Sequence, residues 1–299
     1  MAVIGPTASG KSELALAAVR ALGGLELVAV DAMQVYRGMD IGTAKPTTAE
    51  RVEVPHRCID LVAPADEFTL ADYQAAERAA ESAIAVAGRR AVLVGGTGLY
   101  LRAVLDGLEL PGQWPDVRAE LERQAGHDLA GLHHRLALLD PPAAGKMEPT
   151  NARRIVRALE VCLGSGRPFS SFGPGLDSYP HSAVVQIGLR WSRAALAARI
   201  EHRVAVMMAA GLLDEVRALA EHPDGLSRTA RQALGYKELL DHLEGRSHLD
   251  EAVATIVTRT RQFAVRQDRW FRRDPRIRWV DMTTGPLDAL PAVLQALAA

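Results

Sequence analysis

The residues best suited to chemistry in this sequence lie at its start, in the run Gly5-Pro6-Thr7-Ala8-Ser9-Gly10-Lys11-Ser12. The run matches G-x-x-x-x-G-K-[ST] at every fixed position. Such a loop closes backbone N–H groups around phosphate oxygens, its lysine reaches a terminal phosphate, and the Ser12 hydroxyl suits Mg²⁺. The motif needs a strand before it and a helix after it, and the apolar residues 1–5 and the helix-forming run 13–19 meet both needs. The sequence therefore predicts a site for a di- or triphosphate with Mg²⁺.

Two more polar side chains stand where predicted strands end. Asp31 follows the apolar run 25–30, and Thr97 follows the run 91–94 after two glycines. Residues 70–86, between these runs, are rich in alanine and are predicted to be helical. Strands that alternate with helices predict a parallel sheet, and functional residues gather at the carboxyl ends of its strands. We therefore expect Asp31 and Thr97 beside the phosphate loop.

The order of predicted elements divides the chain into two domains. From Pro111 onward, prolines bracket short helices, and residues 184–191 then alternate like a returning strand. The helices predicted after that strand span 193–221, 230–244 and 249–273. We predict an α/β fold: a P-loop NTPase-like core with a parallel sheet flanked by helices, plus a mostly helical insertion domain. The core would comprise residues 1–112 and 181–299, and the insertion residues 113–180.

Composition excludes several classes of protein. The chain has 299 residues, of which 48% are hydrophobic and 24% charged, so it is neither disordered nor collagen-like. Cys58 and Cys162 lack the spacing of metal ligands. No run of 18 apolar residues occurs, and the amino terminus lacks the pattern of a signal peptide. We therefore expect a cytoplasmic protein without membrane contact, and we expect a monomer.

The net charge of −1 is an average over an uneven distribution. Only four of the 35 basic residues are Lys, and the rest are Arg, whose planar fork suits phosphate oxygens. Residues 258–280 hold eight Arg and two Asp, a net charge of +6. Spacings of 3, 4, 3 and 4 residues place five side chains of this segment on one stripe of a helix: Arg259, Gln262, Arg266, Arg269 and Arg273. The stripe favours phosphate binding, because a basic last turn that complements the helix dipole would not extend back to Arg259.

A different face of the same predicted helix is largely apolar and is expected to pack on the core. It comprises Leu249, Val253, Ile256, Thr260, Phe263, Gln267 and Phe271.

The phosphate loop alone leaves the reaction open. A kinase or ATPase usually holds Mg²⁺ with an acidic residue at the end of another buried strand, but residues 91–94 lead into Gly-Gly-Thr. Asp31 is the acidic residue at the end of the other predicted strand, 25–30, but residues 32–36 after it are too apolar for the switch segment of an enzyme that hydrolyses a nucleotide. Asp31 taken alone is as well explained by the cap of a turn.

Several runs in a fixed order give a more specific signal, and together they resemble the tRNA dimethylallyltransferases, also called tRNA isopentenyltransferases. The resemblance covers most of the chain. The runs are GPTASGKS from Gly5, DAMQVYRGMDIGTAKPT from Asp31, PHRCIDLV from Pro55, FTLADY from Phe68, GGTGLYL from Gly95, RRIVRALEV from Arg153, AALAARIEHRVAVMMAAGLLDEV around Arg203, QALGYKEL from Gln232 and TRTRQFAVRQDRWFRR from Thr258.

The resemblance implies transfer of a dimethylallyl group from dimethylallyl diphosphate to the N6 amine of the adenosine 3′ of the anticodon, in tRNAs that read codons starting with U. Diphosphate would leave, held by the loop Gly5–Ser12 with Mg²⁺ and clamped by Arg203, while Lys11 stabilises the departing charge. Asp31 would take the proton of the amine. Thr97 would hydrogen-bond the amine or the diphosphate and set the geometry of attack.

The resemblance also implies a tRNA anticodon stem-loop as partner, whose target base must leave its stack. Gln34 would read the adenosine because an amide suits adenine edges, and Trp270 would stack on an exposed base. The expected tRNA contacts are Asp31, Ala32, Met33, Gln34, Thr97, Arg118, Arg153, Arg154, Arg157, Gln232, Gly235, Tyr236, Lys237, Arg266, Gln267, Arg269 and Trp270.

Two positions depart from the family pattern: Ala32 stands where Ser is usual, and Arg57 stands where a second His is usual. Loss of the Ser hydroxyl removes one possible hydrogen bond to substrate. The chain also ends without the zinc-finger extension of eukaryotic relatives, which indicates a bacterial form. Two alternatives stay open: a P-loop small-molecule kinase, which would turn over ATP without tRNA, and a noncatalytic tRNA-binding protein whose loop senses nucleotide.

Overall fold

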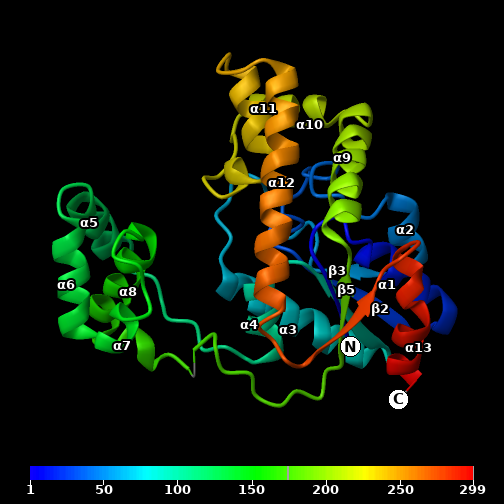
Figure 1. Ribbon diagram of the computed structural model, residues 1–299, viewed down its shortest axis with the longest axis horizontal. Coiled ribbons are helices and arrows are strands. Elements are labelled where there is room, and N and C mark those ends of the chain that lie inside the picture. Colours follow the sequence, from blue (N-terminus) through cyan, green and yellow to red (C-terminus); the bar gives the residue numbers. More distant parts are fainter. Residues whose placement is uncertain (174, 299) are drawn as a thin grey trace. The chain divides into compact units, whose positions relative to one another are not determined.

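Six parallel strands form the centre of the fold in the computed structural model, which describes residues 1–173 and 175–298 (Figure 1). Their order across the sheet is β3-β2-β4-β1-β5-β6. The strands are β1 (Ala2–Ile4), β2 (Leu25–Val30), β3 (His56–Arg57), β4 (Arg90–Gly95), β5 (Gln186–Arg190) and β6 (Ile277–Asp281). Every pairing is parallel, which confirms the predicted α/β fold.

Alternate side chains of the strands enter two separate cores. Val3, Leu27 and Val92 pack with α1 (Lys11–Leu22) and α13 (Leu290–Ala298) on one face. On the other face, the second core joins the sheet to α3 (Leu70–Val86), α4 (Gly98–Leu105), α9 (Arg193–Ala209), α10 (Leu212–Glu221), α11 (Tyr236–Leu243) and α12 (Leu249–Phe271). Because both faces are covered, β1 and β2 are buried along their whole length.

Glu26 is the one charged residue of β2, and it is buried with two counter-ions. Arg57 Nε donates to its Oε2 at 2.7 Å, and Arg89 Nη1 donates to its Oε1 at 3.0 Å. These bonds, that of Arg57 first, hold the pKa of the Glu26 carboxyl below its ordinary value. Arg57, one of the two departures from the family pattern, therefore has a structural role at the edge of the sheet.

Glycines with positive φ interrupt two of the predicted helices. The helix predicted over 193–221 is two helices, because Gly211 adopts φ +97° and begins α10. Within the predicted helix 230–244, residues 230–232 form a short turn, and α11 begins only after Gly235, which adopts φ +90°. By contrast, α3 spans the predicted residues. The strands β3 and β6 and the helices α2 (Thr48–Glu53), α4 and α13 were not predicted.

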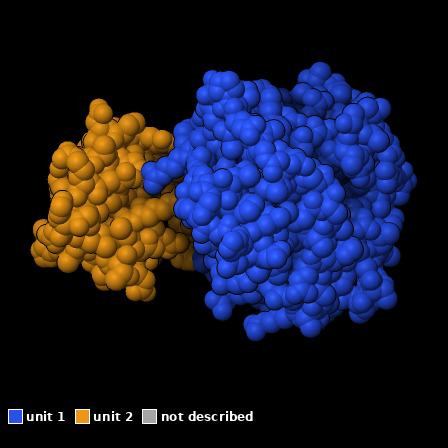
Figure 2. Space-filling model, turned by 90° about the horizontal axis from the view of Figure 1, so that it is seen from above, with its two compact units in different colours: residues 1–106, 181–299 blue, residues 107–180 orange. Residues whose placement is uncertain are grey.

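Residues 107–180 form a unit of their own, shown in orange in Figure 2, whereas residues 1–106 and the segment from His181 form the other. Pro174, one of the prolines of the predicted insertion, lies outside the described residues. The helices of this unit are α5 (Pro115–Ala125), α6 (Leu129–Leu139), α7 (Pro141–Ala144) and α8 (Ala152–Ser165). They enclose a separate core around Leu121, Leu136 and Leu159. Across all described residues, none of the helices combines the length and apolar character that a membrane span requires.

A buried ion cluster joins the end of α4 to the turn before β6. Arg276 Nη1 donates to Asp106 Oδ1 at 2.6 Å, and its Nη2 donates to Asp274 Oδ2 at 2.7 Å. Arg102 also pairs with Asp106. Because the side chains of Asp106 and Asp274 are 2% and 6% exposed, both depend on these cations for compensation of their charge.

Replacing Arg276 with Ala is expected to lower the free energy of unfolding by about 3 kcal/mol, because it leaves two buried carboxylates short of a cation. Urea denaturation followed by circular dichroism measures the change. The matched control is Arg190→Ala, which breaks an exposed pair with Asp281 and should leave the midpoint nearly unchanged. Equal effects of the two variants would contradict a stabilising role for the buried cluster.

Candidate active site

The carboxyl ends of β1, β2 and β4 bring the phosphate loop, Asp31 and Thr97 to one edge of the sheet. Gly95, the last residue of β4, is the register partner of both Ile4 and Val30. A Cβ atom at this position would lie 2.2 Å from the Val30 carbonyl oxygen, so the close approach of the strands requires glycine. The polar side chains that follow these strands therefore lie together, as their spacing predicts.

The loop Gly5–Ser12 has the backbone that phosphate binding requires. Gly10 precedes α1 with φ +85°, and Ala8 adopts φ +62°. Two carbonyl groups of the loop are occupied from outside: Arg199 Nε donates to the Ala8 oxygen at 2.8 Å, and Trp191 Nε1 donates to the Ser9 oxygen at 3.0 Å. Fixing these carbonyls orients the loop, and the amino terminus of α1 adds its dipole.

Gln267 ties the phosphate loop to the end of β4. Its Oε1 accepts from the Thr7 N–H at 2.8 Å, and its Nε2 donates to the Gly96 carbonyl oxygen at 2.8 Å. The side chain is 8% exposed, and both ends of its amide are engaged in these bonds, so the tRNA contact expected at Gln267 stays a prediction. Its place on the predicted apolar face of α12 is the signal that could have identified it as an inward-facing residue.

The site has more positive charge than its one carboxylate neutralises. Lys11 Nζ lies 3.4 Å from the Pro6 carbonyl oxygen. Burial and the neighbouring charge of Arg203 lower the pKa of Lys11 to about 8, while the charge of Asp31 acts in the opposite direction. Burial likewise lowers the pKa of Arg203, again opposed by Asp31. Two cations that share one carboxylate favour the binding of an anion between them.

One oxygen of Asp31 is used by the backbone, and the other is available. Oδ1 accepts from the N–H groups of Met33 and Gln34 at 2.8 and 3.3 Å, which forms the turn after β2. Within residues 1–173 and 175–298, Oδ2 has no hydrogen-bond partner. Thr97 Oγ1 accepts from the Ala32 N–H at 3.4 Å, so the two predicted catalytic side chains lie on adjacent backbone turns.

The amide of Gln34 is held by a neighbouring loop. Its Nε2 donates to the carbonyl oxygens of Thr43 and Ala44 at 3.0 and 3.3 Å, which leaves Oε1 as an acceptor. A cavity of about 290 Å³ joins this side chain to the phosphate loop. Its lining residues include Ser12, Leu16, Leu27, Ala29, Gln34, Lys45 and His56.

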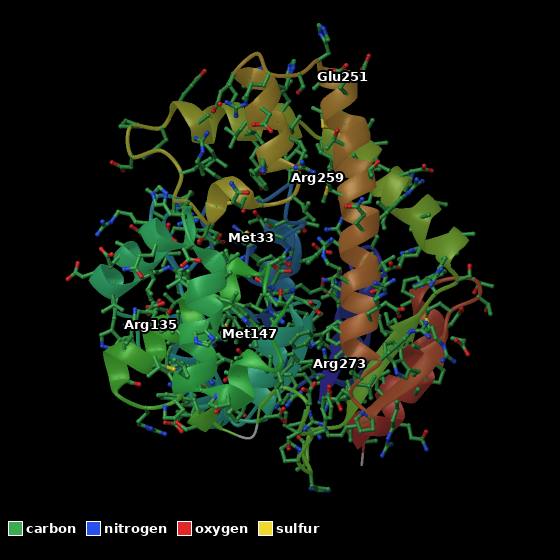
Figure 3. All side chains as sticks on the ribbon, turned by 60° about the vertical axis from the view of Figure 1, so that its left-hand side comes forward. Met33, Arg135, Met147, Glu251, Arg259 and Arg273 are labelled. Atoms are coloured by element: carbon green, nitrogen blue, oxygen red, sulfur yellow. The ribbon has the colours of Figure 1, made fainter. Side chains whose placement is uncertain are left out.

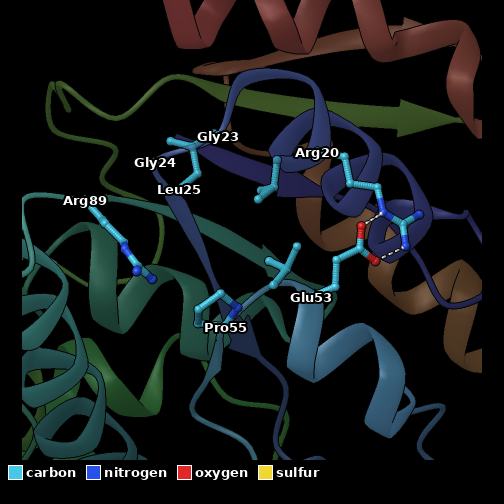
Figure 4. A pocket seen from close by; sticks show the side chains of 9 residues that line it. Arg20, Gly23, Gly24, Leu25, Glu53, Pro55 and Arg89 are labelled. Carbon is cyan, nitrogen blue, oxygen red and sulfur yellow. Dashed lines mark hydrogen bonds and ion pairs between the residues drawn. The ribbon is translucent and has the colours of Figure 1, made fainter.

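A second cavity, of about 350 Å³, lies at the opposite edge of the sheet, where residues precede β2, β3 and β4 (Figure 4). It is lined by Gly23, Gly24, Pro55 and Arg89, together with Arg20 and Glu53. The Arg20 guanidinium pairs with both carboxylate oxygens of Glu53, at 2.7 and 2.5 Å. This cavity lies at the opposite ends of the strands from Asp31 and Thr97, so we assign it no catalytic role.

The Arg stripe of α12 is exposed along most of its length. Figure 3 shows Arg259 near the middle of the helix and Arg273 at its carboxyl end. Arg266 and Arg269 are exposed and have no ion-pair partner in the described part of the chain. Arg259 differs, because its Nη1 donates to the buried Glu238 at 2.6 Å. Trp270 is half-buried against Gly98, where a Cβ atom would lie 2.2 Å from its ring.

Other predicted tRNA contacts divide into exposed and engaged side chains. Tyr236 and Gly235 are buried, whereas Gln232 is exposed and Lys237 half-buried. The tRNA contacts expected at these positions stay predictions. In the unit 107–180, Arg153 and Arg154 are exposed on the first turn of α8. The other two predicted contacts in this unit, Arg118 and Arg157, both pair with the fully buried Glu160, a residue that the sequence did not single out.

Comparison with known proteins shows one family throughout. The family model described as IPP transferase matches residues 34–274. A tRNA dimethylallyltransferase of Streptomyces coelicolor is 48% identical over 99% of this chain and 95% of its own. The crystal structure of a tRNA isopentenylpyrophosphate transferase from Bacillus halodurans is 38% identical, covers 99% of this chain and 94% of its own, and superposes with a TM-score of 0.71. A eukaryotic dimethylallyltransferase, solved in crystallographic snapshots of its action on tRNA, is 26% identical, with coverage of 99% and 77% and a TM-score of 0.80.

Replacing Gln267 with Leu is expected to weaken the binding of inorganic pyrophosphate about tenfold, because it leaves the Thr7 N–H and the Gly96 carbonyl unpaired and frees the phosphate loop. Isothermal titration calorimetry measures the dissociation constant. Gln262→Leu, on the exposed side of the same helix, is the matched control and should bind as the parent does. Unchanged binding by the Gln267 variant would show that the bridge does not order the loop.

Proposed function

The chain belongs to the IPP transferase family of tRNA dimethylallyltransferases, and on that premise we propose how its residues carry out the reaction. The enzyme transfers a dimethylallyl group from dimethylallyl diphosphate to N6 of an adenosine in tRNA, forming i6A and diphosphate. This activity excludes the kinase and the noncatalytic nucleotide sensor. The observation that carries the proposal is the meeting of an anion-binding loop, two cations and a free carboxylate oxygen at one edge of the sheet. The target is proposed to be the adenosine 3′ of the anticodon, in tRNAs that read codons starting with U.

The leaving diphosphate is assigned to the loop Gly5–Ser12. Breaking the allylic C–O bond leaves the electron pair on the diphosphate, so its negative charge grows as the bond lengthens. The loop N–H groups, Lys11 and Arg203 are fixed in place before that charge develops and therefore lower the barrier. The positive charge at Lys11 and Arg203 supports this assignment, because burial and the charge of Arg203 lower the pKa of Lys11, and a bound anion would act in the opposite direction.

Asp31 is proposed to be the base that takes the proton of the adenine amine. The N6 lone pair is delocalised into the ring, so the amine attacks only as its proton is removed and the new C–N bond forms. Oδ2 of Asp31 is the proposed acceptor, since Oδ1 already holds the turn at Met33 and Gln34. The hydroxyl of Thr97 lies on the neighbouring turn and would orient the amine or the diphosphate.

Mg²⁺ is the proposed metal, with Ser12 as its protein ligand. Among the described residues, no group of three His, Cys, Asp or Glu side chains could hold a metal by itself. Mg²⁺ commonly keeps several waters and binds through one or two protein oxygens plus substrate phosphates, and the exposed Ser12 hydroxyl at the first turn of α1 fits that role. When bound, the ion would neutralise part of the charge of the diphosphate.

Two pairs of exposed arginines, each without an ion-pair partner among the described residues, are proposed to contact tRNA: Arg266 and Arg269 on α12, and Arg153 and Arg154 on α8. Gln232, which is exposed, and Lys237, which is half-buried, would add contacts with the backbone of the tRNA. Ala32, Met33 and Gln34 follow the catalytic carboxylate and would face the flipped base. We propose that the enzyme acts as a monomer.

Replacing Asp31 with Asn is expected to lower kcat by about 10²- to 10⁴-fold, because the amide keeps the acceptor that holds the turn but cannot take the proton. Mass analysis of nucleosides from a modified anticodon stem-loop gives the rate. Pyrophosphate should bind at least as tightly as to the parent, because a nearby negative charge is lost. An unchanged kcat would contradict the assignment of the base.

The double variant Arg266→Ala, Arg269→Ala is expected to weaken tRNA binding and to reduce the slope of log K against log salt by about 1.4 to 1.8, the value for two lost phosphate contacts. Filter binding at several salt concentrations measures the slope. Arg272→Ala serves as control, since Arg272 already pairs with Asp268 at 2.8 Å. A slope equal to that of the parent would show that Arg266 and Arg269 do not contact tRNA phosphates.

A further inference from the structure

A single carboxylate on α10 holds three consecutive backbone N–H groups of the loop 39–45. Glu215 Oε2 accepts from Asp40 N–H at 2.9 Å and from Ile41 N–H at 2.7 Å. Glu215 Oε1 accepts from Gly42 N–H at 3.2 Å and from the Tyr236 hydroxyl at 2.6 Å. Hydrogen bonds to a charged acceptor are about twice as strong as neutral ones, so this carboxylate dictates the path of a segment that has no helix or strand of its own.

The fit around Glu215 is tight on the side of α11. A Cβ atom at Gly42 would lie 2.4 Å from Cε2 of Tyr236, so only glycine lets the loop approach the ring. Tyr236 is fully buried, and burial together with the charge of Glu215 raises the pKa of its hydroxyl, which therefore stays a donor. The hydroxyl is thus a fixed part of the support, and Gly42 is required by it.

Lys45 holds the other end of the same loop. Its Nζ is buried and donates to the Tyr36 carbonyl oxygen at 2.5 Å, to Asp40 Oδ1 at 2.8 Å and to Asp60 Oδ1 at 2.5 Å. With Glu215 at residues 40–42 and Lys45 at its end, the loop is fixed from both sides.

This fixed loop is what orients Gln34. The carbonyl oxygens of Thr43 and Ala44, which accept from the Gln34 amide, follow directly after the three N–H groups that Glu215 binds. If the loop moves, the amide loses both acceptors and rotates, because nothing else in the described residues bonds to it. With the loop in place, Nε2 is engaged and Oε1 alone is available, which matches an exocyclic amine donor of adenine.

We propose that Glu215, with Tyr236, is a positioning residue for recognition of the target adenosine, acting through the loop 39–45 on Gln34. The proposal rests on the proposed role of Gln34. It also assigns a role to the LLDEV and QALGYKEL runs, which hold the loop 39–45 that orients Gln34. Helix α11 bonds in turn to α12, since Glu238 accepts from the Gly235 N–H at 2.9 Å and from Arg259 at 2.6 Å. The support of the loop 39–45 is therefore linked through α11 to α12, the helix that carries the Arg stripe.

The first test is Glu215→Gln, which keeps the side-chain volume but replaces one acceptor oxygen with an NH₂ group. That group cannot accept from the N–H groups of the loop. We expect kcat/KM for an anticodon stem-loop to fall at least about tenfold, mostly through kcat, because the base is held in poor alignment. Pyrophosphate affinity should equal that of the parent, since the loop 39–45 does not contact the phosphate loop in any hydrogen bond of the structure's described part. Asp214→Asn, at the exposed neighbouring position, is the control and should keep full activity.

The second test is a double-mutant cycle with Gln34→Ala. If Glu215 acts through Gln34, Glu215→Gln causes no further loss of kcat/KM in the Gln34→Ala background. Full additivity of the two losses, or an equal fall in pyrophosphate affinity, would overturn the proposal in favour of a general structural role. If Gln34→Ala alone has no effect, the reading of adenine by Gln34 fails and the role of Glu215 fails with it, while transfer activity stands.

Tyr236→Phe keeps the test available should the Glu215 variant fail to fold. It removes one hydroxyl and preserves the ring that packs on Gly42. We expect a smaller loss of kcat/KM in the same direction, and the same absence of further loss in the Gln34→Ala background. Activity equal to that of the parent in this variant, with a folded spectrum, would overturn the part assigned to Tyr236.

Discussion

The parallel pairing of β1, β4 and β2 at Gly95 is the constraint on which the rest of the site depends. One residue is the partner of both Ile4 and Val30, so the phosphate loop, the turn at Asp31 and the turn at Thr97 all leave the sheet at the same level. A side chain at Gly95 would push against the Val30 carbonyl and separate them. The catalytic groups therefore owe their distances to backbone pairing in a rigid sheet, and Gln267 adds one bridge between the first and third of these turns.

The same loop motif serves a different chemistry here than in a kinase because of what surrounds it. No acidic residue follows β4, and the cations Lys11 and Arg203 share the charge of Asp31. This arrangement supports the proposal that the cations stabilise a departing diphosphate while the Asp31 carboxylate takes a proton from the attacking amine. The net charge of −1 averages over an uneven distribution, in which residues 258–280 alone carry a net charge of +6.

Much of the fold could be predicted from the sequence, because it depends on local pattern. Helix α3 spans the predicted residues, and the strand ends at Asp31 and Thr97 meet as expected. The exceptions depend on partners distant in sequence. Gln267 bonds to residues 260 and 171 positions away, and Glu215 bonds to a loop more than 170 positions away, so no local pattern identifies these pairings. Arg118 is predicted to be a surface cation because its partner Glu160 is recognisable only once α5 and α8 pack together, whereas the pair of Arg157 with Glu160 has the i,i+3 spacing of one helix and could have been found from the sequence.

The most direct test of the account is to count both products of one reaction. The protein is incubated with dimethylallyl diphosphate, Mg²⁺ and an anticodon stem-loop that carries adenosine 3′ of the anticodon, and i6A and pyrophosphate are quantified in the same sample. The account predicts equal amounts of the two products, and none of either when that adenosine is replaced by guanosine. Pyrophosphate released without i6A, or i6A formed equally on another adenosine of the loop, would contradict it.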